Sequence, residues 1–467
     1  MHRLKYFDNA STTPLRKEVF EAMRPYFREK YGNPSNIYGL GREARLGIIR
    51  ATETITHIIG CKPSEFVYTG SATESDNLAL AGIARTNKEF GNRIIISALE
   101  HKGIMAVCQA LKKEGFEIIE LPVAKNGLVD LVELKQALND RTILVSITMA
   151  DSETGTIQPI KNIAEIIKRF RRQNTPVSTD SKEQPKSNRA PRFKTEISDN
   201  TSLPYFHSDG SQAVGYSDVN VKRLGLDLLT LSAHKFGGPK GIGGLYVGEG
   251  VKIQPIIYGG GQNRLRSGTE NVPAIVGFGA ALELNNRNRN TERRRLKTLR
   301  DKLEKGLMRN LPKIVLNGHK TKRLPNFLNI SILDVEGEAL LLHLDECGII
   351  ANTGSACNSE SLEPSYVLTS MGSCYEFVHG SIRFTLGHDT TSKDIAFVIR
   401  HLPDIVRKLR AISPLNLELN HAKKIAEPRA FIGGKTPHFL RKSKNPPSFG
   451  LRLRTPPFPK GDPPTNR

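Results

Sequence analysis

Short β-branched runs alternate with helical stretches from about residue 14 to 260, and this alternation constrains the fold more than any other feature of the chain. Strands that alternate with helices build a mostly parallel sheet covered by helices on both faces, so the sequence predicts an α/β fold. Such sheets bind ligands in the crevice beyond the carboxyl ends of their strands. Residues directly after the strands are therefore the first candidates for a functional site. The strand-like runs lie at 66–69, 93–97, 116–119, 142–147 and 226–232.

A second, shorter pattern of strand and helix extends from residue 325 to about 411. It includes a strand-like run at 327–332 and a helix-like stretch at 336–346. Between the two patterns, residues 271–310 are predicted to form one long helix, because Pro273 suits a first turn and leucines recur at three- and four-residue spacing. The second pattern predicts a smaller α/β domain.

Two segments interrupt these patterns. Residues 178–203 are rich in Ser, Lys, Asn, Pro and Asp, and residues 415–467 contain nine prolines. Neither segment has the apolar content of a packed unit. The chain has 467 residues, which is too long for a single core. We therefore expect a large domain at 14–262 with a mobile insertion at 178–203, a smaller domain formed by 1–13 and 263–414, and a disordered tail at 415–467.

The chain carries a formal net charge of +21. Residues 415–467 hold eleven Lys and Arg against three Asp and Glu, so the tail is disproportionately basic. The tail could be solvated and disordered, or it could contact a nucleic acid or another acidic partner.

No stretch approaches the roughly 18 apolar residues of a membrane helix, and the first residues lack an apolar signal core. These features predict a cytoplasmic protein with no membrane partner.

The five cysteines are odd in number and include no CxxC pair, which argues against a disulfide framework or a zinc ribbon. Cys357 lies within 351–359, where every neighbour is small or polar, so its backbone is expected to be mobile and wet. An accessible thiol can ionise and attack, whereas a buried one is inert. Cys357 is therefore a candidate nucleophile. The other cysteines lie beside apolar or helical stretches and are expected to pack: Cys61, Cys108, Cys347 and Cys374.

A lysine and a carboxylate follow two of the predicted strands. Lys235 lies in a glycine-rich turn after an apolar strand, where desolvation lowers the pKa of an amine toward the range that forms a Schiff base. Asp209 ends another strand, where it could pair with a pyridinium nitrogen. Together they are the minimal set for pyridoxal phosphate. By spacing alone, Lys235 could be an ordinary surface lysine and Asp209 a helix cap.

A cradle for a phosphate is predicted at 68–77, which reads as a strand, a turn of small residues and a helix start. Ser71 and Glu74 have the spacing of a capping box, and the free amides of the first turn would face a phosphate with the helix dipole behind them. The same pattern would serve equally well as a cap without a ligand.

Taken together, the motifs resemble those of the cysteine desulfurases of the NifS/IscS type, which belong to the class V aminotransferases. The resemblance covers about residues 4 to 414, and its motifs occur in the family's order. It implies the pyridoxal-phosphate fold type I, with a mostly parallel seven-stranded sheet in the large domain. The matching motifs lie at 6–14, 31–34, 72–77, 100–102, 232–235, 266–269, 354–357 and 381–384.

The resemblance assigns most of the cofactor site. It implies Lys235 as the Schiff-base lysine, Asp209 on the pyridine nitrogen and Gln212 near the phenolic oxygen. His101 would stack on the ring and assist proton transfer. The phosphate would be held by Ala72, Thr73, Ser232 and His234, with Thr269 reaching across from a second subunit, which implies a homodimer.

The resemblance also assigns the substrate and the reaction. Arg383 matches the arginine that binds the carboxylate of L-cysteine, and Asn33 lies in a motif on the substrate side. Cys357 would take the substrate sulfur as a persulfide, leaving L-alanine, and would pass it to an iron–sulfur scaffold, to transfer-RNA thiolation or to another sulfur acceptor. Cys357 could also act as a transient ligand of a nascent cluster.

One substitution departs from the family pattern near the cofactor. Ser152 stands where the family usually has an asparagine bonded to the phenolic oxygen, and its shorter side chain can donate one hydrogen bond.

Two alternative functions stay open at this point. One is a selenocysteine lyase or another class V enzyme, and the other is a scaffold or nucleic-acid binder that uses the basic tail.

Overall fold

The computed structural model describes residues 4–174, 203–354, 364–414 and 416–417. Its largest sheet has seven strands in the order β2-β8-β7-β6-β5-β3-β4. Strand β8 is antiparallel to both neighbours, and the other neighbouring pairs are parallel. The predicted seven-stranded, mostly parallel sheet is thus confirmed. Its strands are β2 (Phe66–Thr69), β3 (Arg93–Ser97), β4 (Glu117–Leu121), β5 (Thr142–Ser146), β6 (Tyr205–Asp209), β7 (Leu228–Ser232) and β8 (Gly243–Val247).

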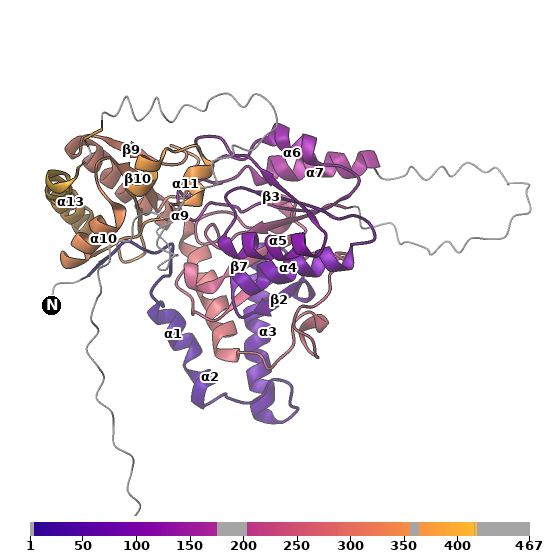
Figure 1. Cartoon of the computed structure of the whole chain (residues 1–467). Helices are drawn as coiled ribbons and strands as arrows, with labels where there is room; N and C mark the ends of the chain where they lie inside the picture. Colours follow the sequence, from indigo (N-terminus) through magenta and orange to yellow (C-terminus); the bar gives the residue numbers. More distant parts are fainter. Residues whose placement is uncertain (1–3, 175–202, 355–363, 415, 418–467) are drawn as a thin grey trace, which may run out of the picture. The chain divides into compact units, whose positions relative to one another are not determined.

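Helices cover both faces of this sheet, as Figure 1 shows. Ile94 and Ile96 of β3 pack with helices α4 (Ala72–Thr86) and α5 (Lys102–Lys113). Ile95 between them faces the opposite core. Because alternate side chains enter two apolar cores, the strands are hydrophobic without interruption. Helices with buried side chains in the opposite core include α1 (Lys17–Met23), α3 (Gly39–Ile59), α6 (Leu131–Ala137), α7 (Ile160–Asn174) and α8 (Val221–Leu224).

Helix α9 (Val272–Asn310) connects the large sheet to a second core. Its first half packs with the large sheet's core through Ile275 and Phe278, and its second half buries Leu303 and Leu307 in the other core. The predicted helix at 271–310 is confirmed, with Pro273 in its first turn. The remaining helices are α2 (Pro25–Arg28), α10 (Gly337–Glu346), α11 (Tyr366–Ser370), α12 (Tyr375–His379) and α13 (Ser392–Ile412).

A three-stranded antiparallel sheet, in the order β12-β10-β9, forms the second core with α10 and α13. The chain's first strand, β1 (Lys5–Tyr6), pairs with β11 (Ile349–Ile350), so the N-terminal segment joins this part of the molecule. From there, residues 7–13 run toward the end of β7, where the amide of Thr13 donates to the carbonyl of His234 at 3.0 Å. The strands are β9 (Ile314–Leu316), β10 (Phe327–Ile332) and β12 (Ser381–Thr385).

The division into domains stays a prediction, because residues 1–427 group as a single unit in the structure. The two separate cores and the pairing of β1 with β11 agree with assigning the N-terminal strand to the smaller part. Most of the predicted insertion and nearly all of the predicted tail lie outside the described residues. No helix in the described ranges is long and apolar enough to cross a membrane.

Candidate active site

Two neighbouring parallel strands bring Asp209 and Lys235 to one edge of the large sheet. Asp209 is the last residue of β6, and Lys235 lies in a 3-10 turn directly after β7. Asp209 is 9% exposed, and its carboxylate accepts a hydrogen bond from the Ser211 amide at 2.8 Å. The topology therefore places a buried carboxylate and an amine at the carboxyl ends of the strands, as the sequence predicts.

The N-terminal segment holds the Lys235 amine. Lys235 Nζ donates to the carbonyl oxygens of Ala10 at 2.6 Å and Ser11 at 2.9 Å. Gln212 Nε2 also donates to the Ala10 carbonyl, at 3.0 Å, so both predicted cofactor residues lie against one short stretch of main chain. Nδ1 of His234 lies 3.1 Å from Thr12 Oγ1.

Burial, together with the charges of Lys235 and Lys240, lowers the pKa of His234 to about 4. The ring is therefore neutral at pH 7, so one of its nitrogens carries a proton and the other can accept one.

The start of α4 forms the predicted phosphate cradle. Ser71 caps the helix by accepting the Glu74 amide at 3.1 Å, while the amides of Ala72 and Thr73 belong to the first turn, which has no intrahelical acceptors. A Cβ on Gly243 of β8 would lie 2.6 Å from the carbonyl carbon of Ser71. Only glycine lets the sheet approach the helix end this closely, and this close fit shapes the cradle.

His101 lies next to this cradle as the N-cap of α5, where its Nδ1 accepts the Gly103 amide at 3.1 Å. A Cβ on Gly103 would lie 3.2 Å from both Thr73 Cγ2 and His101 Nδ1, so the two helix starts are close neighbours. Desolvation lowers the pKa of His101; the charge of Asp209 opposes this shift and that of Lys235 adds to it. The ring therefore lies within electrostatic range of both groups.

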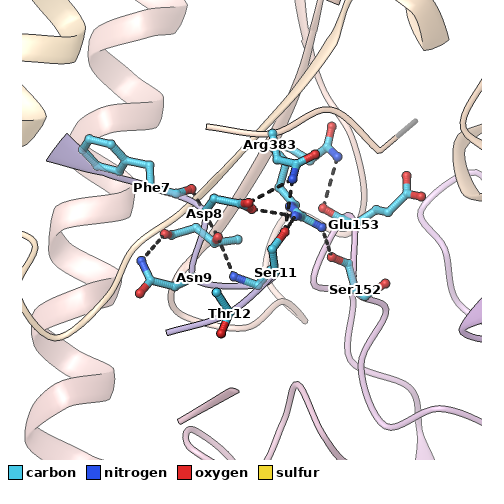
Figure 2. Close-up of polar contacts among 12 residues, drawn as sticks. Phe7, Asp8, Asn9, Ser11, Thr12, Ser152, Glu153 and Arg383 are labelled. Atoms are coloured by element: carbon cyan, nitrogen blue, oxygen red, sulfur yellow. Dashed lines mark hydrogen bonds and ion pairs between the residues drawn. The ribbon is translucent and has the colours of Figure 1, made fainter. Parts of the chain in front are cut away.

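Arg383 of β12 contacts the same N-terminal segment at Asp8 and Ser11, as Figure 2 shows. Its Nη2 donates to Asp8 Oδ1 at 2.7 Å and to Ser11 Oγ at 2.9 Å, and its Nη1 donates to the Ser152 carbonyl at 2.8 Å. Asn352 Nδ2 donates to the second oxygen of Asp8 at 2.9 Å. Ser11 thus lies between the Lys235 amine and the Arg383 guanidinium.

Glu153 contacts both flanks of the segment that carries Cys357. The Ser365 hydroxyl donates to Glu153 Oε2, and a Cβ on Gly354 would lie 2.0 Å from the same oxygen. Burial and the charge of Asp151 raise the pKa of Glu153 to about 7, against the opposing effect of the Ser365 hydrogen bond. Cys357 itself lies outside the described residues.

A layer of buried titratable groups lies close to Asp209. Burial raises the pKa of Glu100 to about 8, although its carboxylate accepts the Ser97 hydroxyl at 2.6 Å. Burial and the charge of Asp209 together raise the pKa of Asp76, whose Oδ1 lies 3.7 Å from Nε2 of His207. Burial therefore favours the neutral forms of Asp76 and Glu100.

The structure brings most of the predicted residues together, but not all. Asn33 is exposed, and its side chain accepts the amide of Ser35 in its own turn rather than joining the site. Ser152 contributes its main-chain carbonyl to Arg383. Thr269 is exposed, and its delivery by a second subunit stays a prediction.

Four residues of the site were missed by the sequence analysis: Asp8, Ser11, Asn352 and Glu153. Asp8 and Ser11 lie in the 6–14 motif, which carries the family resemblance but does not by itself indicate a contact with Arg383.

The model of the Aminotransferase class-V family matches residues 5–183 and 195–398. The chain belongs to the class-V aminotransferase family. This family member is 46% identical over 411 residues to "Cysteine desulfurase IscS" of Methanosarcina thermophila, covering 88% of this chain and 94% of the relative.

Solved structures show the same likeness. A structure titled "NIFS-LIKE PROTEIN" matches with a TM-score of 0.76 and 32% identity over 87% of this chain and all of that chain. One titled "SspA in complex with cysteine" matches with a TM-score of 0.67 and 29% identity, covering 82% of this chain and 98% of that chain.

The cofactor of this class-V family member is pyridoxal phosphate, and the residues present fit it. The close approach of Gly243 to the start of α4 leaves a helix N-terminus for the phosphate, and buried Asp209 offers a carboxylate to the pyridine nitrogen. The Lys235 amine would hold the aldehyde carbon. The other holding residues would be Ala72, Thr73, Gln212, Ser232 and His234, with Ser152 near the phenolic oxygen and Thr269 supplied by a second subunit.

Proposed function

We propose that this chain removes the sulfur atom of L-cysteine. L-cysteine and the Cys357 thiol would yield L-alanine and a persulfide on Cys357, with no other reactant. The contacts of Ser11 carry this proposal: its carbonyl accepts from Lys235 Nζ at 2.9 Å and its hydroxyl accepts from Arg383 Nη2 at 2.9 Å. An amine that can move a proton and a guanidinium that can bind a carboxylate therefore flank one residue, as an α-amino acid substrate requires.

Arg383 binds and orients the substrate in this proposal. Its planar fork matches a carboxylate better than a lysine would, and its burial at 7% exposure strengthens the interaction. When bound, pyridoxal phosphate would supply an electron sink that weakens the bonds to the substrate's α-carbon.

Lys235 is the group that moves the proton. Its Nζ lies between two carbonyl acceptors, which stabilise the charged amine after it takes a proton from the α-carbon. His101 is held at Nδ1 by the Gly103 amide, so its other ring nitrogen is the one that can hold or donate a proton in the site.

The Cys357 thiol receives the sulfur and passes it on. Glu153 fixes the two described flanks of the Cys357 segment beside Arg383, which supports delivery of the thiol to the same site. An iron–sulfur scaffold protein, transfer-RNA thiolation or another sulfur-accepting protein would then take the persulfide sulfur. The chain acts as a homodimer in this proposal, with Thr269 of a second copy completing the phosphate site.

Mass spectrometry tests the proposal directly. After incubation with L-cysteine, a peptide containing Cys357 should carry one added sulfur atom, and alanine should be released in step with it. Cys357→Ala should lose both signals and retain cofactor absorbance. The matched control is Cys374→Ala, because Cys374 is half-buried and burial raises the pKa of its thiol. Sulfur on Cys374 instead, or alanine release by Cys357→Ala, would refute the proposal.

A further inference from the structure

The hydrogen-bond donors of Arg383 are largely occupied. A guanidinium carries five N–H donors. Both hydrogens of Nη2 are used, one by Asp8 Oδ1 at 2.7 Å and one by Ser11 Oγ at 2.9 Å, and one hydrogen of Nη1 is used by the Ser152 carbonyl at 2.8 Å. Nε is buried and has no hydrogen-bond partner among the described residues. Two donors are left: Nε–H and one hydrogen of Nη1.

Nε–H and the remaining Nη1 hydrogen do not lie side by side, so they cannot both bind the same carboxylate. A carboxylate is bound most firmly by two parallel N–H groups on one edge of the guanidinium. The guanidinium offers two such edges. One consists of Nε and Nη2, and the other of Nη1 and Nη2, so a carboxylate on either edge needs a hydrogen of Nη2. In the structure, both of those hydrogens belong to Asp8 and Ser11.

We propose that Asp8 is a specificity-determining residue, whose carboxylate occupies the edge of Arg383 that the substrate carboxylate takes and is displaced when the substrate binds. The proposal rests on the assignment of Arg383 to the substrate in the proposed function. It goes further because the Nη2 donors of Arg383 are already hydrogen-bonded within the protein, so a ligand gains from Arg383 only by competing with the Asp8 carboxylate.

The surroundings of Asp8 allow this exchange. Asn352 Nδ2 stays on Asp8 Oδ2 at 2.9 Å when the other oxygen is released, so the carboxylate keeps one donor. Ser11 Oγ accepts from Arg383 Nη2 at 2.9 Å and from Asn352 Nδ2 at 3.1 Å, which leaves its hydroxyl proton to turn toward Asp8. The buried charge of Asp8 therefore retains hydrogen bonds in both states.

Competition of this kind selects by charge. A ligand without a carboxylate leaves the Asp8–Arg383 pair intact and gains nothing from the arginine. An ester or amide is a weaker acceptor than Asp8 and does not displace it. A free α-carboxylate is the group that can take its place.

A pair of ligands that differ by one carboxylate tests this proposal on the intact holoenzyme. L-alanine and ethylamine share an amine and a two-carbon frame, and their dissociation constants can be measured from the absorbance of the bound cofactor without turnover. Asp8→Asn keeps the shape and the acceptor oxygen but removes the competing charge. We expect it to lower the dissociation constant of L-alanine about tenfold, the factor of one charge-assisted hydrogen bond, and to leave that of ethylamine unchanged.

A matched pair elsewhere in the chain supplies the control. Asp218 also accepts a hydrogen bond from an arginine, Arg223 of helix α8, at 2.7 Å, and both side chains of this pair are exposed. Asp218→Asn should change neither dissociation constant. Unchanged or weaker binding of L-alanine by Asp8→Asn, or an equal shift for ethylamine, would overturn the proposal.

Two further measurements separate this proposal from the function on which it rests. Arg383→Gln should remove the preference for L-alanine over ethylamine, and a retained preference would refute the assignment of Arg383 itself. If Asp8→Asn does not fold, a crystal structure of the unmodified protein with L-alanine decides the matter. We expect Asp8 to have left Nη2 there, and an intact Asp8–Arg383 pair beside a bound carboxylate would contradict the proposal.

Discussion

The Glu153 carboxyl group accepts a hydrogen bond from Ser365 and lies so close to Gly354 that a side chain there would not fit. The carbonyl of its neighbour Ser152 accepts a hydrogen bond from Arg383. It is 5% exposed, and burial raises its pKa to about 7. At neutral pH the residue is therefore divided between a neutral and a charged form. The charge at this position should therefore change with pH near neutrality.

Replacing Glu153 by Gln should remove a pH dependence of stability. The pKa is about 7 in the native protein and 4.5 in the reference state, so between these values the native state binds more protons and stability falls as pH rises. Glu153→Gln cannot lose a proton. Relative to the unmodified protein, its free energy of unfolding should therefore gain about 2 kcal/mol between pH 5 and pH 8.

Urea unfolding at the two pH values measures this difference. Glu100 and Asp76 also have raised pKa values, but they are present in both proteins and cancel in the comparison. The exposed Glu338→Gln serves as a control for the change of side chain. Parallel pH profiles for Glu153→Gln and the unmodified protein would show that Glu153 stays charged throughout.

Among single residues, the sequence was most informative where chemistry and position coincide. The positions of Lys235 and Asp209 could be predicted because Asp209 ends one apolar strand and Lys235 lies in the turn directly after another. Asp8 and Asn352 could not, because they are far from Arg383 along the chain and join it only in the folded protein. No periodicity in the sequence reports a polar contact between such distant residues.

Secondary-structure elements set the shape of the phosphate cradle. Strand β8 passes so close to the start of α4 that a Cβ on Gly243 would lie 2.6 Å from Ser71 C and 2.9 Å from Ala72 N. Both are backbone atoms, which cannot rotate away as a side chain can. The spacing between one strand and one helix end therefore fixes where the first amides of α4 point.

Gly243→Ala should weaken cofactor binding through this contact. The added methyl group pushes the first turn of α4 away from the sheet, and the amides then no longer converge on the phosphate. We expect the dissociation constant of pyridoxal phosphate to rise at least about tenfold, measured by fluorescence titration of the cofactor-free protein. Gly39→Ala is the matched control, since a Cβ there meets nothing within 4 Å. Equal affinities in the two variants would show that α4 tolerates the displacement.

At this scale the sequence predicts the strands well, since side chains buried on both faces leave continuous apolar runs. The runs at 66–69, 93–97 and 327–332 match β2, β3 and β10. The run at 116–119 is shifted, because Phe116 precedes β4 and packs in the core beside α5. The contact of Gly243 with α4 could not be read from the sequence, since it depends on strand order in the sheet.

In the whole molecule, apolar side chains are exposed on neighbouring stretches of the chain. Phe27, Tyr31, Ile37 and Tyr38 are 58%, 65%, 88% and 52% exposed. Large exposed apolar patches mark interaction sites on soluble proteins. A second copy of the chain is the partner that the proposed homodimer supplies, and it would bring Thr269 to the phosphate site.

Ile37→Asp should therefore separate the two copies. A charge in an apolar interface loses its hydration without gaining a partner, so the variant should sediment near 51.7 kDa while the unmodified protein sediments at about twice that mass. Cofactor affinity should fall in the same variant, because the separated copy no longer receives Thr269. Ile412→Asp is the matched control: Ile412 is 80% exposed at the end of α13, and its replacement should leave both the mass and the affinity unchanged. A monomeric unmodified protein with full cofactor affinity would instead show that one chain completes the site alone.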